Sequence, residues 1–510
     1  MASTGLRSFY QKLTKDMSPP VFFGAGLVVI SFCVYGILAT ENASRTFEAL
    51  QIRVTTYAGW YYLLIVTGLL GFCLWLAFSD VRKIRIGGPD AKPEFGLLSW
   101  FAMLFTAGMG IGLVYWAVAE PVLHYASPLM ADPMTDMARR EAMRMTFFHW
   151  GLHPWAIYAV LALAVAVSHF NLGLPLTPRS VFFPILGQRI HGPIGDGIDI
   201  LSTVGTLLGV STSLGLGAQQ IAAGLEQFAG FGDSLRLQLT IIAVITGVAV
   251  VSVVLGVKEG IQRLARLNGL LAIVVVGFVF VAGPTFTILQ TFVTTLGGYV
   301  QNLPRMSLFI DVGDTSWQKD WTFFYWGWWI SWAPFVAIFV ARISRGRTVG
   351  EFVATVLLVP TLVTFVWVSV FGGAALEHEV GGTGSLSGVA AERPAVALYA
   401  FLADLPFPTI TQVTATLLIT IFFITSSDSG SLVDDIVTAG GRLHPPRWQR
   451  VFWATAEGAA AMTLLIVGGL QAIRNASISL GVLMSLIVIG AAVSLAIRLP
   501  RMKQDLIREG

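Results

Sequence analysis

The chain has 510 residues, of which 55% are hydrophobic and only 12% are charged, and its mean hydropathy is +0.73. A soluble protein carries roughly 25% charged residues, so this composition excludes an ordinary soluble globular domain and indicates an integral membrane protein. The net charge of +3 comes from basic residues in short loops between apolar runs. It therefore reports membrane topology and gives no support for a nucleic-acid partner.

Apolar runs long enough to cross a hydrocarbon core of about 30 Å, which takes roughly 20 helical residues, recur along the chain. We predict twelve membrane-spanning helices at about 20–40, 57–79, 97–120, 145–169, 200–228, 237–256, 268–291, 321–341, 350–372, 406–432, 449–468 and 475–497. With both termini in the cytoplasm, 22 of the 32 Lys and Arg residues fall on the cytoplasmic side, as the positive-inside rule expects. The sequence therefore predicts an all-α, multi-pass membrane protein.

Motifs of enzymes and of ATP-driven pumps are missing from the sequence. The seven histidines show no HExxH spacing, and no GxxxxGK[ST] nucleotide-binding loop occurs. Both cysteines, Cys33 and Cys73, fall inside predicted spans, where we expect them to be small buried side chains. The spans are also too apolar for the polar stripe of a channel pore. These observations favour a secondary transporter that has no cofactor.

Five tryptophans lie in one apolar segment, the string WTFFYWGWWISW at 321–332. An indole face is the best cation–π partner among the side chains, and the ring has only one N–H donor. At 100° per residue Trp328, Trp329 and Trp332 share one face of the helix, about 10–17 Å from its start, whereas Trp326 points elsewhere. This face predicts a pocket for a cation that makes no strong hydrogen bonds, such as a quaternary ammonium group.

A second aromatic group lies in the string FHWGLHPWAIY at 148–158, where Trp150, Trp155 and Tyr158 occupy an arc of about 140°. Aromatic residues also anchor helices at the lipid–water boundary. We expect that anchoring role for Trp321, and it stays open for Trp150 and Trp326. For Trp328, Trp329 and Trp332, plain helix packing is a further alternative.

A run of alternating glycines, AGMGIG at 107–112, lies inside the third predicted span. Each glycine costs a helix about 1 kcal/mol relative to alanine. Two explanations stay open. Gly108 and Gly112 have the spacing of small residues that let helices pack closely. Alternatively, the helix is discontinuous, so that its free carbonyls bind a cation and a half-helix end binds a carboxylate.

A polar string, FFITSSDSGS at 422–431, closes another apolar run. Adjacent hydroxyl groups and nearby carbonyls are the oxygen ligands that a hard cation such as Na⁺ prefers. The alternative is that polarity simply increases where the helix leaves the membrane, with Asp428 as a cap or an ion-pair partner. An intramembrane carboxylate would be a functional candidate.

Taken together, these strings closely resemble the signature of the betaine/carnitine/choline transporter family. The matching strings are WTFFYWGWW at 321–329, ISWAPF at 330–335, ARISRGR at 341–347, AGMGIGL at 107–113, FHWGLHPWAIY at 148–158, TSLGLGAQQI at 212–221 and FFITSSDSGS at 422–431. The resemblance implies a leucine-transporter-like fold and a homotrimer. It divides the chain into a tail at 1–19, two peripheral helices at 20–96, inverted five-helix repeats at 97–291 and 321–497, a connector at 292–320 and a tail at 498–510.

The resemblance also implies a substrate site and a sodium site. The substrate site would be an aromatic box formed by Trp150, Trp155, Tyr158, Trp328, Trp329 and Trp332, with Phe324, Trp326, Met109 and Gly110 close by. Sodium would bind the carbonyls of Ala107, Met109 and Phe422 and the hydroxyls of Thr425 and Ser426. A second sodium site uses two threonines one turn apart. Thr206 matches the first of them, but Val210 replaces the second.

A residue that the glycine run lacks narrows the range of ligands expected for such a box. Proton-coupled choline carriers of this family have an Asp in or just after that run, whereas this chain has Gly112 followed by Leu113. Glycine betaine brings its own carboxylate, which a helix end can bind. We therefore expect Na⁺-coupled import of glycine betaine across a bacterial inner membrane. Choline, carnitine, ectoine, trimethylamine oxide, dimethylsulfoniopropionate and ion-independent exchange remain alternatives.

Overall fold

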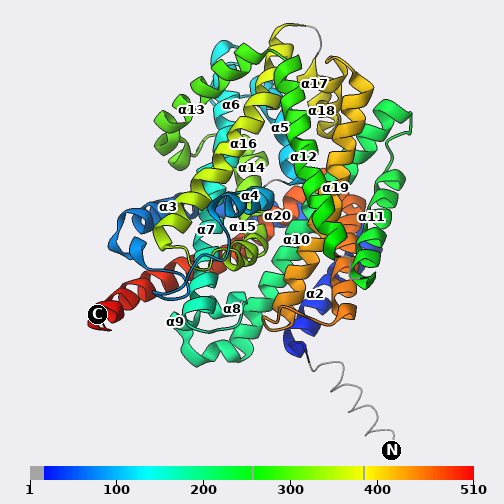
Figure 1. The fold of residues 1–510 in the computed structure, drawn as a ribbon. Coiled ribbons are helices and arrows are strands. Elements are labelled where there is room, and N and C mark those ends of the chain that lie inside the picture. The colour runs from blue at the N-terminus through cyan, green and yellow to red at the C-terminus, as the bar shows by residue number, and fades with distance from the viewer. Residues whose placement is uncertain (1–15, 109, 256–257, 383–384, 510) are drawn as a thin grey trace, which may run out of the picture.

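The computed structural model describes residues 16–108, 110–255, 258–382 and 385–509, and the regular structure of these residues is helical without any strand. The first half contains α2 (Pro19–Leu38), α3 (Thr40–Phe78), η1 (Asp80–Lys83), α4 (Leu97–Gly108), α5 (Ile111–Ala126), α6 (Asp136–Trp150), α7 (Leu152–Ala166), η2 (Val167–Asn171), α8 (Pro178–Val181), α9 (Phe183–Leu186), η3 (Gly187–His191), α10 (Pro193–Ala229) and α11 (Leu235–Leu255). The second half contains α12 (Lys258–Ala282), α13 (Thr285–Leu308), α14 (Ser316–Asp320), α15 (Thr322–Arg342), α16 (Val349–Val380), α17 (Leu386–Glu392), α18 (Pro394–Ala403), α19 (Pro408–Thr438) and α20 (Arg447–Glu509). Figure 1 shows α17 and α18 at one end of this bundle and α8 and α9 at the other.

Ten helices in the described part of the chain are long and apolar enough to cross a membrane. Twelve spans were predicted, and two features account for the difference. The span at 97–120 is divided between α4 and α5, each of which is too short to cross alone. The last two predicted spans both lie in α20, which consists of two helices joined at a kink, because the backbone of Gly468 and Gly469 is not helical. The predicted class, a helical multi-pass membrane protein, is confirmed.

One predicted boundary is wrong. The seventh span was expected to end near residue 291, but α12 ends at Ala282, because Gly283 and Pro284 interrupt the apolar run. The following helix, α13, begins at Thr285 and therefore well before the predicted connector at 292–320. Apolar side chains remain exposed along α13, including Phe286 and Val293, as expected for a helix that lies at a membrane interface.

Burial separates the interior helices from those that face lipid. The most apolar stretches of α6–α7, α10 and α15 are 94%, 83% and 89% buried, whereas those of α2, α11 and α12 are at most 33% buried. The interior helices approach one another closely because glycines face their neighbours. A Cβ atom at Gly327 of α15 would lie 2.7 Å from the Cα atom of Ile478 in α20, and one at Gly209 of α10 would lie 3.3 Å from the Trp332 backbone. The tryptophan segment is therefore held in the centre of the bundle.

Candidate functional site

The third predicted span is broken at the glycine run. α4 ends at Gly108, and α5 begins at Ile111 after Gly110, whose backbone is extended (φ −138°, ψ 177°). Met109 lies outside the described residues. The first backbone N–H groups of α5 have no partner within their own helix and carry the positive end of its dipole. The discontinuous helix was one of the two explanations left open by the sequence, and it is what the structure contains.

Close packing, the other explanation, applies to Gly112. A Cβ atom at Gly112 would lie 2.5 Å from the Trp328 ring and 3.3 Å from the Trp150 ring. Gly110, in contrast, has open space where its Cβ atom would lie. The two glycines therefore have different roles. Gly110 belongs to the helix break, and Gly112 lets two indole rings reach the backbone of α5.

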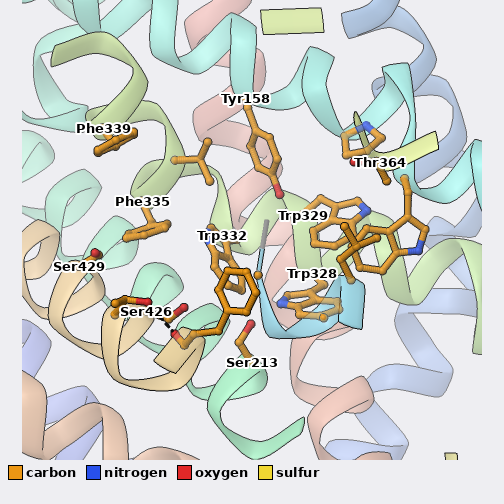
Figure 2. Close-up of a pocket in the computed structure, with 18 of the residues that line it drawn as sticks. Tyr158, Ser213, Trp328, Trp329, Trp332, Phe335, Phe339, Thr364, Ser426 and Ser429 are labelled. Carbon is orange, nitrogen blue, oxygen red and sulfur yellow. Dashed lines mark hydrogen bonds between the residues drawn. The ribbon is translucent and has the colours of Figure 1, made fainter. Parts of the chain in front are cut away.

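A cavity of about 180 Å³ opens beside this helix break. Its walls come from α5, α6, α7, α10, α12, α15, α16 and α19. Ten of the residues proposed from sequence line it: Gly110, Trp150, Trp155, Tyr158, Trp328, Trp329, Trp332, Phe422, Thr425 and Ser426. Figure 2 shows Tyr158, Trp328, Trp329 and Trp332 around a common space, with Ser426 and Ser429 across from them. The two aromatic groups, far apart in sequence, thus share one cavity.

The aromatic rings of this cavity support one another. Trp329 stacks on Trp328 with 4.7 Å between ring centroids and meets Trp150 edge-on at 4.9 Å. Trp155 and Tyr158 form a second edge-on pair at 5.4 Å. The indole N–H of Trp329 donates to the His149 carbonyl at 3.0 Å. Ring faces are therefore held in fixed orientations around the cavity, which is the arrangement that cation–π binding requires.

Two further tryptophans keep their N–H groups unused. The Nε1 atoms of Trp328 and Trp332 are buried and have no hydrogen-bond partner in the described structure. No Asp, Glu, Lys or Arg lines the cavity among the described residues. A buried donor without a partner costs free energy, so these groups are suited to an uncharged or zwitterionic ligand that brings an acceptor.

Phe324 and Trp326 do not line the cavity. Trp326 is fully buried between Phe148, at 5.2 Å, and His153, at 5.5 Å. Phe324 packs behind the cavity wall and stacks on Trp328 at 5.5 Å. The sequence placed Trp326 on another helical face, and the structure agrees with that placement.

Trp321 was expected to be an anchor at the lipid–water boundary, and this expectation is wrong. Its side chain is only 8% exposed. The guanidinium group of Arg474 lies over the rings of Trp321, Trp116 and Phe324 at 5.3 to 5.4 Å. A cation of the protein itself therefore occupies this neighbouring cage of aromatic rings. The sequence could not indicate the contact, because Arg474 lies in α20, far along the chain.

The proposed sodium ligands are only partly placed. The Thr425 hydroxyl bonds to carbonyls of its own helix, those of Ile421 at 2.9 Å and Phe422 at 3.1 Å. Ala107 lies in the last turn of α4, and the remaining ligand, Met109, lies outside the described residues. Thr206 and Val210 are buried in α10 and do not line the cavity. Sodium binding by either set stays a prediction.

A buried carboxylate behind the cavity wall was missed by the sequence reasoning, as were the polar lining residues Ser213, Asn268, Thr364 and Ser429. Glu120 of α5 is fully buried, and its carboxylate accepts hydrogen bonds from Trp150 Nε1 at 2.8 Å and the Tyr325 hydroxyl at 2.5 Å. His149 Nδ1 and His124 Nε2 lie 2.7 and 3.1 Å from its other oxygen. The signal was present, because a carboxylate at the end of an apolar span is a functional candidate. Glu120 holds the Trp150 ring in place.

Glu120, His124 and His149 could together ligate a metal ion, since their ligand atoms lie within 4.8 Å of one another. Hydrogen bonds between these side chains already account for the cluster, in which His124 Nδ1 is the one nitrogen without a partner in the described structure. Each carboxylate oxygen has two partners, and His149 Nε2 lies 3.0 Å from the Thr322 hydroxyl. We therefore interpret the cluster as a hydrogen-bonded support for the aromatic wall.

Comparison with known proteins assigns the chain to a family. The model of the betaine/carnitine/choline family transporters (BCCT) matches residues 20–504. The chain belongs to the BCCT family. Glycine betaine transporter 1 of Vibrio parahaemolyticus is 43% identical over 95% of this chain and 94% of its own length, and the glycine betaine transporter OpuD of Bacillus subtilis is 41% identical over 95% of both. An uncharacterised transporter of Mycobacterium tuberculosis is 44% identical over 94% of this chain and 82% of its own. This BCCT protein is a membrane transporter and not an enzyme.

The substitution Gly112→Ala tests whether the glycine serves the aromatic wall. The added methyl group would collide with the Trp328 ring, and overpacking of this kind costs about 1–3 kcal/mol. We expect substrate affinity to fall about tenfold or more while the protein still inserts. Equilibrium binding to the purified transporter measures this. Gly247→Ala in α11, where a Cβ atom meets nothing within 4 Å, should leave affinity unchanged, and equal losses in both variants would contradict the argument.

Proposed function

We propose that this BCCT transporter imports glycine betaine by Na⁺ symport. The observation that carries the proposal is the composition of the cavity wall: stacked indoles, two indole N–H groups without a partner, the start of α5 and no charged side chain among the described lining residues. Ring faces stabilise the trimethylammonium group by about 2 kcal/mol for a desolvated contact. The carboxylate of glycine betaine supplies the hydrogen-bond acceptor that the two indole N–H groups and the N-terminus of α5 lack.

Choline satisfies this wall less completely than glycine betaine does. Choline has the cation but no carboxylate, so it leaves the N–H donors and the helix end without an anion. Relatives of comparable similarity are named for broader ranges, including a Vibrio parahaemolyticus transporter of glycine betaine, proline, choline and ectoine that is 41% identical over 95% of this chain and 88% of its own length. Carnitine, ectoine, trimethylamine oxide and dimethylsulfoniopropionate are therefore the competitors against which glycine betaine has to be compared.

Sodium coupling is proposed from the oxygens beside the cavity. The Phe422 carbonyl and the hydroxyls of Thr425 and Ser426 lie on α19 across from the break between α4 and α5. A Na⁺ ion that joins the two elements would fix the broken helix and complete the aromatic box, and rocking of the interior helices would then carry substrate inward. We place the transporter in the bacterial inner membrane as a homotrimer with both termini in the cytoplasm.

Uptake into proteoliposomes tests substrate and coupling ion together. An inward Na⁺ gradient should accumulate labelled glycine betaine at least tenfold above the level reached when K⁺ replaces Na⁺. Unlabelled choline, carnitine, ectoine and dimethylsulfoniopropionate, added as competitors, should inhibit less than glycine betaine does. Accumulation that is independent of Na⁺ would contradict symport, and stronger inhibition by choline would contradict the role of the carboxylate.

A further inference from the structure

A group of buried carboxyl groups lies outside the proposed site, at the end of α19 that leads into α20. Its members are Asp428, Asp434 and Asp435 of α19 and Glu457 of α20, each of which is at most 7% exposed. The group lies on a different face of α19 from the cavity. Asp434 follows Ser426, which lines the cavity, by eight residues, or about 12 Å along the helix.

Only one basic side chain pairs with this group among the described residues. The Arg450 guanidinium lies 3.2 Å from an Asp428 oxygen and 3.4 Å from an Asp435 oxygen. It has no ion pair with Asp434 or Glu457. One guanidinium group therefore faces four carboxyl groups, and two fully buried members, Asp434 and Glu457, have no basic partner in the described structure.

Asp434 and Glu457 have almost no hydrogen bonds to their carboxyl oxygens. Both oxygens of Asp434 are buried and have no partner, and neither has Oε1 of Glu457. The remaining Glu457 oxygen accepts one long bond, of 3.4 Å, from the Ser427 hydroxyl. Glu457 lies against Gly430 of α19, and Asp434 follows Gly430 by one helical turn on the same face, so the two carboxyl groups are neighbours. Two buried, neighbouring carboxylates cannot both keep their charge without donors.

The surroundings of Glu457 favour a proton over a metal ion. Its free oxygen and a methyl group of Val210 both lie within 3 Å of the point where a Cβ atom of Gly430 would stand. On that side the carboxyl group therefore faces the α19 backbone and an aliphatic side chain. A hard cation needs several oxygen ligands, whereas a proton needs only the two carboxyl groups.

We propose that Asp434 and Glu457 form a proton-binding site, distinct from the substrate cavity and from the candidate sodium ligands. In the packed arrangement of α10, α19 and α20 the pair holds at least one proton. A conformation that opens this end of α19 to water lets the carboxyl groups ionise and releases the proton. The equilibrium between the packed and the open arrangement then changes by up to tenfold per pH unit for one proton.

Infrared spectroscopy of the purified full-length transporter tests the proton directly and needs no substrate. At neutral pH the wild type should show the carbonyl band of a protonated carboxylic acid, shielded from water. Asp434→Asn and Glu457→Gln, which keep the side-chain shapes, should each reduce this band. Glu48→Gln, at an exposed position, should leave it unchanged. A band that is absent from the wild type, or unaffected by both variants, would overturn the proposal.

Thiol labelling tests the link to helix movement. Ser431 is buried on α19, three residues before Asp434. A cysteine at this position can react only when this end of α19 opens to water. In a background without the native cysteines, labelling of Ser431→Cys should increase with pH more steeply than in the same background with Glu457→Gln. The thiol itself ionises in both proteins, so this ionisation cannot cause a difference between them. If labelling depends on pH equally in the two proteins, the proposal is overturned. Neither measurement depends on which onium compound is transported.

Discussion

Replacement of Trp329 by alanine should weaken glycine betaine binding by about 30-fold or more. Trp329 stacks on Trp328, meets Trp150 edge-on and is held by its bond to the His149 carbonyl. The variant removes one desolvated cation–π contact, of about 2 kcal/mol, which corresponds to about 30-fold in the dissociation constant. It also removes the support of two neighbouring rings. Equilibrium binding to the purified, correctly assembled transporter measures the loss.

A matched pair of phenylalanine variants separates cation binding from packing. Trp329→Phe keeps a ring with a weaker face and should cause a smaller but measurable loss of affinity. Trp326→Phe makes the same chemical change at a buried ring that does not line the cavity, so affinity should stay within about twofold of wild type. If the two variants lose affinity equally, the cavity wall has been assigned to the wrong face of α15.

Glu120→Gln should reduce both stability and substrate affinity, although Glu120 itself does not line the cavity. The carboxylate accepts from Trp150 and Tyr325 and contacts two histidines. A glutamine offers one acceptor oxygen and turns an amide N–H₂ group toward a neighbour that also donates. Breaking a buried charged network costs about 3–5 kcal/mol. We expect a clear drop in the thermal unfolding temperature and an affinity loss of at least tenfold, through a displaced Trp150 ring.

Two comparisons check the assignment of Glu120 as a positioning residue. Glu377→Gln removes the partner of Arg139 in a partly exposed ion pair, which is worth little, so stability should hardly change. In Glu120→Gln, fluorescence of the Trp150 indole should shift even without substrate, because its N–H bond is altered. Normal affinity in a destabilised Glu120→Gln protein would show that the network supports the fold but not the aromatic wall.

Helical periodicity carried much of the site prediction. Trp328, Trp329 and Trp332 share a face because they lie in one regular helix, and that face does line a cavity. The partner wall at 150–158 followed from the same reasoning, and the family assignment is confirmed by comparison. That these residues bind substrate stays a prediction.

Contacts between distant helices could not be predicted from the pattern of one segment. Arg474 reaches Trp321 from α20, and Glu120 is surrounded by donors from α6 and α15. In the sequence, Val210 stands out only because it replaces an expected threonine of the second sodium site. The structure places the Glu457 carboxyl group beside it. In each case the deciding partner lies far away in sequence, and only the packed bundle brings the two groups together.

The guanidinium of Arg474 over three aromatic rings has a consequence for selectivity. Arg474 is a resident cation with diffuse charge and weak hydration, and it lies one ring away from the cavity, because Phe324 separates the two. The Glu120 carboxylate lies behind the same wall of rings, hydrogen-bonded to Trp150, so two resident charges of opposite sign stand behind the cavity. We therefore expect the cavity to suit a cargo that carries both charges itself, although the cargo touches neither resident charge.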